Sequence, residues 1–173
     1  MPRSYGPIMQ NGYLVESIDE AAEHWAKRLG VGPFFKFSGL TFKELYLRDA
    51  PAEIDMTVAI AYWGDMQIEL IEQHCSNETV YSDFARTKTT GLHHVGVETD
   101  DIDAAVSELG AAGCPPIWHG EAENGTRFAY VASDFHPGAM VELISFAEPV
   151  KPAFAAIKAA AENWDENTVF GSF

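Results

Sequence analysis

Two segments of this chain are near copies of two others, and this internal repeat limits the folds available to it. Residues 10–22 align without a gap with residues 94–106, at an offset of 84. In that alignment Gly12 matches Gly96, and Gln10 matches His94. The offset is too long for a solenoid, whose repeats span about 20–50 residues. It is typical of two copies of a small βαβββ module, each too small to bury its own core comfortably.

A second pair of copies places one glutamate inside an apolar run. Residues 68–71 read IELI and residues 141–144 read VELI, so Glu69 and Glu142 occupy equivalent positions. These glutamates are 73 residues apart, so the first module carries 84 − 73 = 11 extra residues. A carboxylate in an apolar strand is costly to bury unless something pairs with it. A metal ion is the partner that best explains two copies.

Composition limits the classes of partner. With 173 residues, of which 47% are hydrophobic, the chain suits one compact domain or two closely packed half-domains. Its formal charge of −15 argues against nucleic acid and anionic membranes, because both demand a basic patch. The amino terminus lacks an apolar leader segment, and no stretch approaches a membrane span. Cys75 and Cys114 have no metal-type spacing, and together these features predict a cytoplasmic protein.

Hydrophobic periodicity predicts the same order of elements in both copies. The first copy is expected to contain a strand, a helix that begins at the Ser17 cap and ends at Leu29, a second strand and a hairpin. Its strands are expected over 8–15, 33–38, 56–63 and 66–72, whereas residues 40–53 are hard to assign. The second copy is expected to have strands over 91–99, 115–120, 126–133 and 139–145, with a helix over 102–109 and a turn at Gly138.

We therefore expect an α+β fold in which two tandem βαβββ modules form one cupped, mixed sheet. A single domain over 1–173 would comprise modules over 8–73 and 91–147, joined by a connection over 74–90. That connection is expected to hold a short helix near residues 81–84. An amphipathic helix over 151–165 is expected to pack on a sheet edge or a partner subunit, with a lid over the site as the alternative. A homodimer is an open possibility.

Strand alternation predicts which side chains share the hollow of the cup. The helix of each module covers the apolar face, which leaves Gln10 and His94 on the uncovered face. Glu69 and Glu142 each alternate with apolar neighbours in the same way. If the two sheets join, these four side chains can converge. His93 is expected to point to the helix-covered face, as a structural residue.

These motifs resemble the vicinal oxygen chelate superfamily. The pattern consists of QNGYLV, GDMQIELI, GLHHVGVETDDIDAA and PGAMVELI, and it covers roughly residues 8–147. That superfamily includes glyoxalase I, bleomycin-resistance proteins, extradiol dioxygenases and methylmalonyl-CoA epimerase, and the flanks of His93 and His94 are most similar to the epimerase branch. The resemblance implies one divalent metal, held by Gln10, Glu69, His94 and Glu142. Three oxygens and one imidazole nitrogen suit Mn²⁺, Co²⁺, Ni²⁺, Mg²⁺, Fe²⁺ or Zn²⁺.

The same resemblance implies a lyase or an isomerase (including an epimerase) that chelates adjacent oxygens of a small substrate and stabilises an enolate. Glu142 is the expected base, and Glu69 its partner on the opposite side. The expected substrate contacts are Tyr62, Trp118, His119, Phe128 and Tyr130.

Two alternatives remain open, a non-catalytic binding protein of the bleomycin-resistance type and an iron-dependent extradiol-type dioxygenase. The chain also departs from two named relatives. The epimerases carry a second acid on the strand before Glu69, and residues 57–61 here contain none. Glyoxalase I carries an arginine where Leu14 stands.

Overall fold

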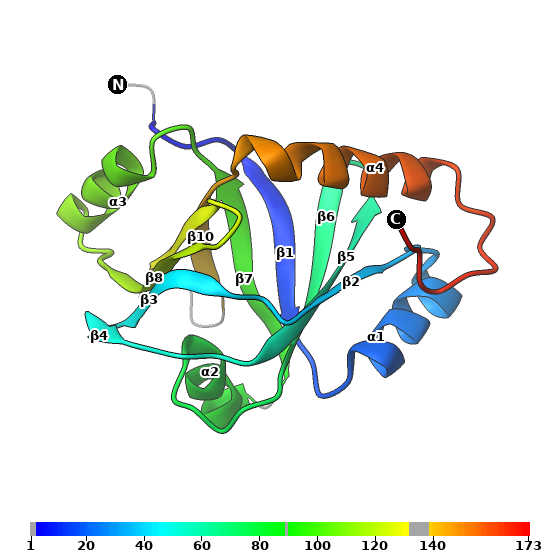
Figure 1. Cartoon of the computed structure of the whole chain (residues 1–173), viewed down its shortest axis with the longest axis horizontal. Coiled ribbons are helices and arrows are strands. Elements are labelled where there is room, and N and C mark those ends of the chain that lie inside the picture. The colour runs from blue at the N-terminus through cyan, green and yellow to red at the C-terminus, as the bar shows by residue number, and fades with distance from the viewer. Residues whose placement is uncertain (1–2, 89, 132–138) are drawn as a thin grey trace.

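A single curled, mixed sheet organises the whole molecule (Figure 1). The computed structural model describes residues 3–88, 90–131 and 139–173, without the side chains of residues 87 and 88. Its ten strands are β1 (Ile8–Leu14), β2 (Phe35–Ser38), β3 (Phe42–Leu47), β4 (Ala50–Pro51), β5 (Met56–Trp63), β6 (Met66–Gln73), β7 (Gly91–Glu98), β8 (Pro116–Ala122), β9 (Arg127–Val131) and β10 (Met140–Ser145).

The sheet repeats one strand order on either side of its centre. Its full order is β2-β5-β6-β1-β7-β10-β9-β8-β3-β4. β1 and β7 pair antiparallel at the centre, and each pairs in parallel with the last strand of its own half, β6 or β10. The predicted α+β fold with two βαβββ modules in one cupped sheet is therefore confirmed. The two modules pair within one chain.

Residues 40–53, which the sequence left unassigned, contribute a hairpin to the other half of the sheet. β3 and β4 pair antiparallel across Arg48 and Asp49, both of which have a positive φ. Two consecutive positive φ angles are typical of a tight two-residue hairpin turn. β3 then pairs antiparallel with β8, so strands from the first half extend the second half.

Two helices cover the outer face of the sheet. α1 (Ile18–His24) begins at the Ser17 cap, as predicted, and continues as a π-helical turn over Trp25–Leu29. α3 (Ile102–Ala111) begins at Asp101, whose carboxylate accepts a hydrogen bond from the Ala104 N–H. The apolar face of α1 packs on outward side chains of β5 and β6, and that of α3 packs on outward side chains of β9 and β10, as the buried clusters show. The inner face of the curled sheet is left for other contacts.

The other two helices meet the inner face at opposite ends of the sheet (Figure 1). α2 (Val80–Lys88), longer than the predicted 81–84, buries Tyr81 against Trp118 and Tyr130. α4 (Lys151–Glu162) buries Ile157 against Phe35 and Ile60.

α4 packs on the inner face of the edge strand β2 and its neighbour β5, which agrees with the expected helix on a sheet edge. The predicted turn at Gly138 and the predicted strand end beyond Val131 lie outside the described residues. Within the described ranges, no helix has the length and apolar character that a bilayer crossing requires.

Candidate metal centre and cavity

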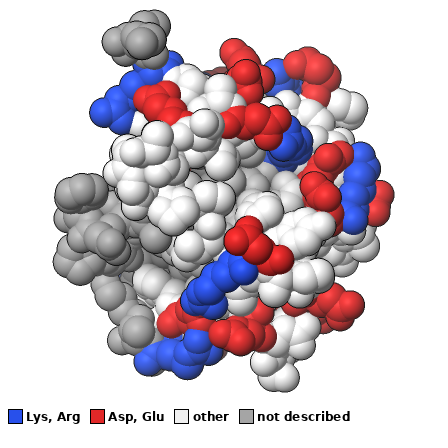
Figure 2. Space-filling model, turned by 90° about the vertical axis from the view of Figure 1, so that its left-hand side faces the viewer, with Lys and Arg blue, Asp and Glu red and all other residues white. Residues whose placement is uncertain are grey.

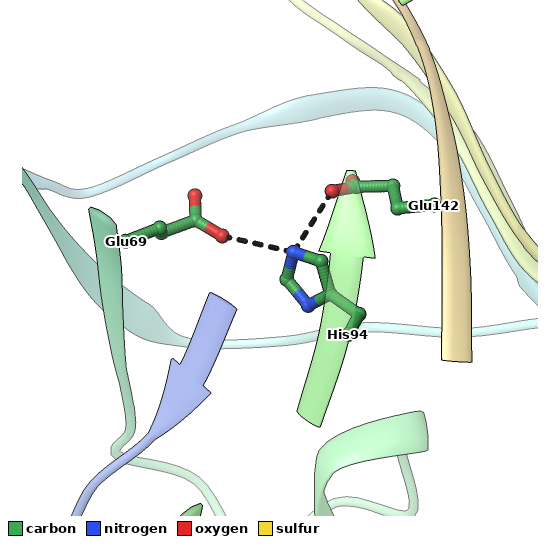
Figure 3. Close-up of side chains that lie close together, drawn as sticks. All are labelled: Glu69, His94 and Glu142. Carbon is green, nitrogen blue, oxygen red and sulfur yellow. Dashed lines mark ion pairs between the residues drawn. The ribbon is translucent and has the colours of Figure 1, made fainter. Parts of the chain in front are cut away.

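Four side chains from the two halves converge at the centre of the inner face. His94 Nε2 lies 3.1 Å from Glu142 Oε2 and 3.4 Å from Glu69 Oε2. Figure 3 shows the two carboxylates approaching the imidazole from opposite sides. Gln10 Oε1 lies 3.1 Å from the same nitrogen. The structure therefore brings together all four side chains that the sequence suggested as ligands.

Strand register explains this convergence. Gly12 lies between Glu69 of β6 and His94 of β7, whereas Gln10 lies between Gln67 and Gly96. Because side chains two residues apart share a face, both rows point into the cup. The parallel β7–β10 pairing then sets Glu142 beside Gly96.

Two glycines make room for the converging groups. A Cβ on Gly12 would lie 1.9 Å from the His94 ring, and a Cβ on Gly96 would lie 2.5 Å from Gln10 Oε1. Each glycine thus faces the side chain contributed by the other half. This need for space explains why Gly12 and Gly96 match each other in the sequence repeat.

The donor set fits a divalent cation. One imidazole N–H can donate to one acceptor, yet three oxygens surround His94 Nε2. A six-coordinate ion with bonds of about 2.1 Å places neighbouring donor atoms about 3.0 Å apart. The observed separations of 3.1 and 3.4 Å are close to that spacing. Among the described residues, Glu69, His94 and Glu142 form a group able to hold an ion.

A chain of amides orients Gln10. Its Nε2 donates to Gln67 Oε1 at 2.6 Å, and Gln67 Nε2 donates to the Tyr62 hydroxyl at 3.0 Å. With its N–H group engaged on that side, Gln10 directs its carbonyl oxygen toward His94. Gln67 was absent from the predicted site, although its place two residues before Glu69 on one strand could have indicated it.

His93 departs from the predicted alternation. Gly12 pairs with His94 and Tyr13 with Leu92, so His93 is the extra residue of a β-bulge. Its ring packs against Tyr81, Phe84 and Tyr130, not against α3. This corrects the expected location, because a bulge interrupts the period of two. The Nδ1 atoms of His93 and His94 lie 3.2 Å apart, within hydrogen-bonding distance.

Burial and the carboxylates set the protonation of the two histidines in opposite ways. Burial, aided by neighbouring His94, lowers the pKa of His93 to about 3. Burial alone would also lower the pKa of His94, but Glu142 and Glu69 outweigh it and raise that pKa to about 9. Burial raises the pKa of Glu142 against the opposing effect of His94. In the metal-free centre His94 is therefore an imidazolium at neutral pH.

A cavity of about 300 Å³ opens beside this centre, and Gln10, Glu69 and Glu142 line it. Most other lining side chains are apolar or aromatic and come from both halves, α2 and α4. They include Phe37, Leu40, Phe42, Met56, Val58, Ile60, Tyr81, Trp118, Phe128, Tyr130, Ile144, Phe146, Ala153 and Phe154. This size and character are typical of small-molecule sites.

Three of the five predicted substrate contacts lie on the cavity wall and two do not. Trp118, Phe128 and Tyr130 line it. His119 stacks on Tyr46 on the opposite face of β8, because it alternates with the inward Trp118. Tyr62 faces inward but packs against residues of α4 and accepts a hydrogen bond from Gln67. The predictions for His119 and Tyr62 are corrected accordingly.

α2 and α4 also contribute to the cavity wall, and only the position of α4 over the site was among the alternatives that the sequence left open. Tyr81 closes one end, where its hydroxyl lies 2.9 Å from the Tyr130 hydroxyl. Ala153 and Phe154 of α4 line the cavity, and Phe154 packs on Phe146. Both helices reach the cavity only through tertiary packing.

Comparison with known proteins places the chain in a family. The profile described as Glyoxalase/Bleomycin resistance protein/Dioxygenase superfamily matches residues 9–130. The chain belongs to this superfamily. The resemblance seen in the sequence is thereby confirmed. No curated protein sequence matches the chain significantly.

Several solved structures share the fold of this chain, and methylmalonyl-CoA epimerases are among them. A hypothetical protein from Bacillus halodurans is 18% identical, with a TM-score of 0.59 and coverage of 82% of this chain and 95% of that one. Methylmalonyl-CoA epimerase from Mycobacterium tuberculosis is also 18% identical, with a TM-score of 0.59 and coverage of 90% and 95%. A Streptomyces coelicolor methylmalonyl-CoA epimerase variant bound to 2-nitronate-propionyl-CoA is 14% identical, with a TM-score of 0.59 and coverage of 84% and 97%. At these identities the likeness shows the fold alone.

Proposed function

We propose that this protein is a metal-dependent lyase or isomerase that removes a proton from a carbon next to a carbonyl group. The observation that carries the proposal is the convergence of Gln10, Glu69, His94 and Glu142 beside an apolar cavity. A divalent ion held by these residues (Zn²⁺, Ni²⁺, Co²⁺, Mn²⁺ or Fe²⁺) would supply Lewis acidity to two adjacent substrate oxygens. Membership in the superfamily supports the same class of chemistry.

Glu142 is the proposed base. It lines the cavity, and burial raises the pKa of its carboxyl toward the range in which a base works best at neutral pH. Its carboxylate takes the proton, and the electron pair of the broken C–H bond passes into the enolate. Return of that proton from Glu142 to the neighbouring carbon, with the substrate hydroxyl proton passing to the former carbonyl oxygen, completes an isomerisation.

Glu69 is the proposed partner on the other side of the substrate. Figure 3 places it across His94 from Glu142, and its second oxygen points away from the imidazole. When the proton that Glu142 has taken passes to Glu69, Glu69 can deliver it to the face opposite the one that Glu142 deprotonated, and the result is epimerisation. The remaining residues orient the ligands and exclude water. Gln67 holds Gln10 in place, and the aromatic walls keep water from the enolate.

The structure argues against a methylmalonyl-CoA epimerase mechanism that uses an acid on the strand before Glu69. The residues of β5 that line the cavity are Met56, Val58 and Ile60, all of them apolar, and Ile60 stands directly opposite Glu69. Any second acid must therefore come from elsewhere in the site, which is why we assign it to Glu69.

Two measurements test the proposal. Protein purified without chelator is analysed for metals and titrated with each of the five ions, and one ion per chain is expected. 2-Hydroxyacetophenone, which has two adjacent oxygens and an acidic C–H, is then incubated in D₂O, and proton NMR reports exchange at that carbon. We expect Glu142→Gln to abolish exchange while the circular dichroism spectrum stays unchanged. Ligand binding that persists without an ion, together with an absence of exchange, would favour the non-catalytic alternative. Oxygen consumption would favour the dioxygenase.

A further inference from the structure

The charge of the cavity wall limits what it can hold. None of the described residues that line the cavity is Lys, Arg or His. The two lining carboxylates, Glu69 and Glu142, carry together the charge that one divalent ion would neutralise. The imidazole and the Gln10 amide add no net charge to the loaded site. An anion that binds in the cavity would therefore lose its hydration without gaining a surplus positive charge as a partner. That loss of hydration is costly in free energy.

Among the described residues, three basic side chains whose neighbours in the chain line the cavity form ion pairs with acidic side chains. Lys151 follows the lining residue Val150, but its ammonium group pairs with Glu148 at 2.6 Å. Lys43 pairs with Glu121 at 2.6 Å, and Arg127 with Asp103 at 2.7 Å. On the face shown in Figure 2, basic side chains lie beside acidic ones and form no continuous patch. The net charge of −15 also repels an approaching anion.

The polar groups at the exposed rim of the cavity are neutral. Asn124 is exposed and accepts a hydrogen bond from the Thr126 N–H at 2.9 Å, and both residues line the cavity. Around the interior, Phe42 packs edge-on to Phe128, and Phe146 packs on Phe154. Aromatic walls of this kind bury an apolar ring well and offer a carboxylate no positively charged partner.

We propose that the cavity selects an uncharged substrate in which two adjacent oxygens are attached to an apolar ring or chain, and that it rejects anionic substrates, including acyl-CoA thioesters. This inference rests on the proposed function, since it assumes that the adjacent oxygens face the metal centre. It specifies the part of the substrate that the metal does not touch.

A matched set of probes tests this selectivity by isothermal titration calorimetry. The protein is loaded with Zn²⁺, or with Ni²⁺ if Zn²⁺ does not bind. The parent probe is 2-hydroxyacetophenone. Two derivatives carry a carboxylate at the meta or the para position of the phenyl ring and so add a charge to the ring. Hydroxyacetone lacks the ring. We expect each of these three, as well as methylmalonyl-CoA, to bind at least about tenfold more weakly than the parent.

A gain-of-binding variant keeps the test independent of folding defects. Asn124→Lys places a cation at the exposed rim and is expected to strengthen binding of at least one ring carboxylate several-fold relative to the parent probe. The matched control is Ser107→Lys, which adds the same charge to an exposed position on α3 and should change neither affinity. Equal effects of the two variants would show that overall charge, not the cavity wall, governs binding, and would overturn the inference.

The two proposals fail in different ways. If the ion binds at one per chain but a ring carboxylate or hydroxyacetone binds within about twofold of the parent probe, the substrate class is wrong and the metal centre stands. If no ion binds stoichiometrically, the proposed function fails, and the substrate inference fails with it.

Discussion

Gly12 of β1 lies directly opposite His94 of β7, so closely that a methyl group on Gly12 would come within 1.9 Å of the imidazole ring. The same relationship holds between Gly96 and Gln10 in the other half. Each half therefore supplies one polar side chain and the gap that the polar side chain of the other half occupies. This exchange couples the two halves at the centre of the sheet.

Gly12→Ala is expected to displace His94 and to abolish stoichiometric metal binding. The added methyl meets a fully buried ring that cannot move without disturbing its neighbours, and overpacking of this kind costs about 1–3 kcal/mol of stability. Metal analysis and urea denaturation measure the two effects. The control is Gly110→Ala in α3, where a Cβ meets nothing within 4 Å and stability should rise by about 0.5–1 kcal/mol. Full metal occupancy in Gly12→Ala would contradict the assigned role of this glycine.

Gln67→Met is expected to weaken metal binding although Gln67 is not one of the predicted metal ligands. It removes the oxygen that accepts from Gln10 Nε2, so the Gln10 carbonyl loses its fixed direction. Loss of such a supporting contact typically costs about 10–100-fold in metal affinity. Tyr62→Phe removes only the hydroxyl at the end of this series of hydrogen bonds, so it should lower metal affinity less than Gln67→Met does. Competition with a chromophoric chelator measures both affinities, and an unchanged affinity in Gln67→Met would count against Gln10 as a ligand.

His93→Phe is expected to lower metal affinity by about 10–100-fold while keeping the fold. The phenyl ring can still pack against Tyr81 and Phe84, but the nitrogen 3.2 Å from His94 Nδ1 is lost. Without that partner, His94 is free to adopt the tautomer that carries its proton on Nε2, the atom facing the site. The exposed His24 serves as the control in His24→Phe. Equal affinities in the two variants would assign His93 to packing alone.

Metal binding is expected to release protons and to strengthen as the pH rises toward about 9. In the metal-free protein His94 has its pKa raised to about 9, so an ion must displace a proton at neutral pH. The raised pKa of His94 also makes the stability of the metal-free protein depend on pH. The contribution of His94 to the metal-free protein is complete below about 6.5 and is lost as the pH rises through 9. Calorimetry in buffers of different ionisation enthalpy counts the released protons. A count near zero at pH 7 would contradict this protonation state.

Strand alternation predicted inward side chains wherever the strands are regular. It placed Phe128 and Tyr130 together, and both line the cavity. It failed at His93, since a β-bulge inserts this residue and interrupts the period of two. Tyr62 shows another limit, because alternation gives the face of a side chain but not its neighbours. α4 packs where Tyr62 points, so this tyrosine contacts the helix and Gln67 instead of the cavity.

The repeated sequence by itself determined the two modules, the cupped sheet and the equivalence of Gln10 with His94 and of Glu69 with Glu142, since equal patterns of polar and apolar residues fold into equal units. Tertiary structure alone decided that the β3–β4 hairpin crosses to β8, that α2 and α4 close the cavity, and that Gln67 directs Gln10. These features depend on contacts between residues far apart in the chain. Their energies come from shape and burial in the assembled sheet, and no local pattern records them.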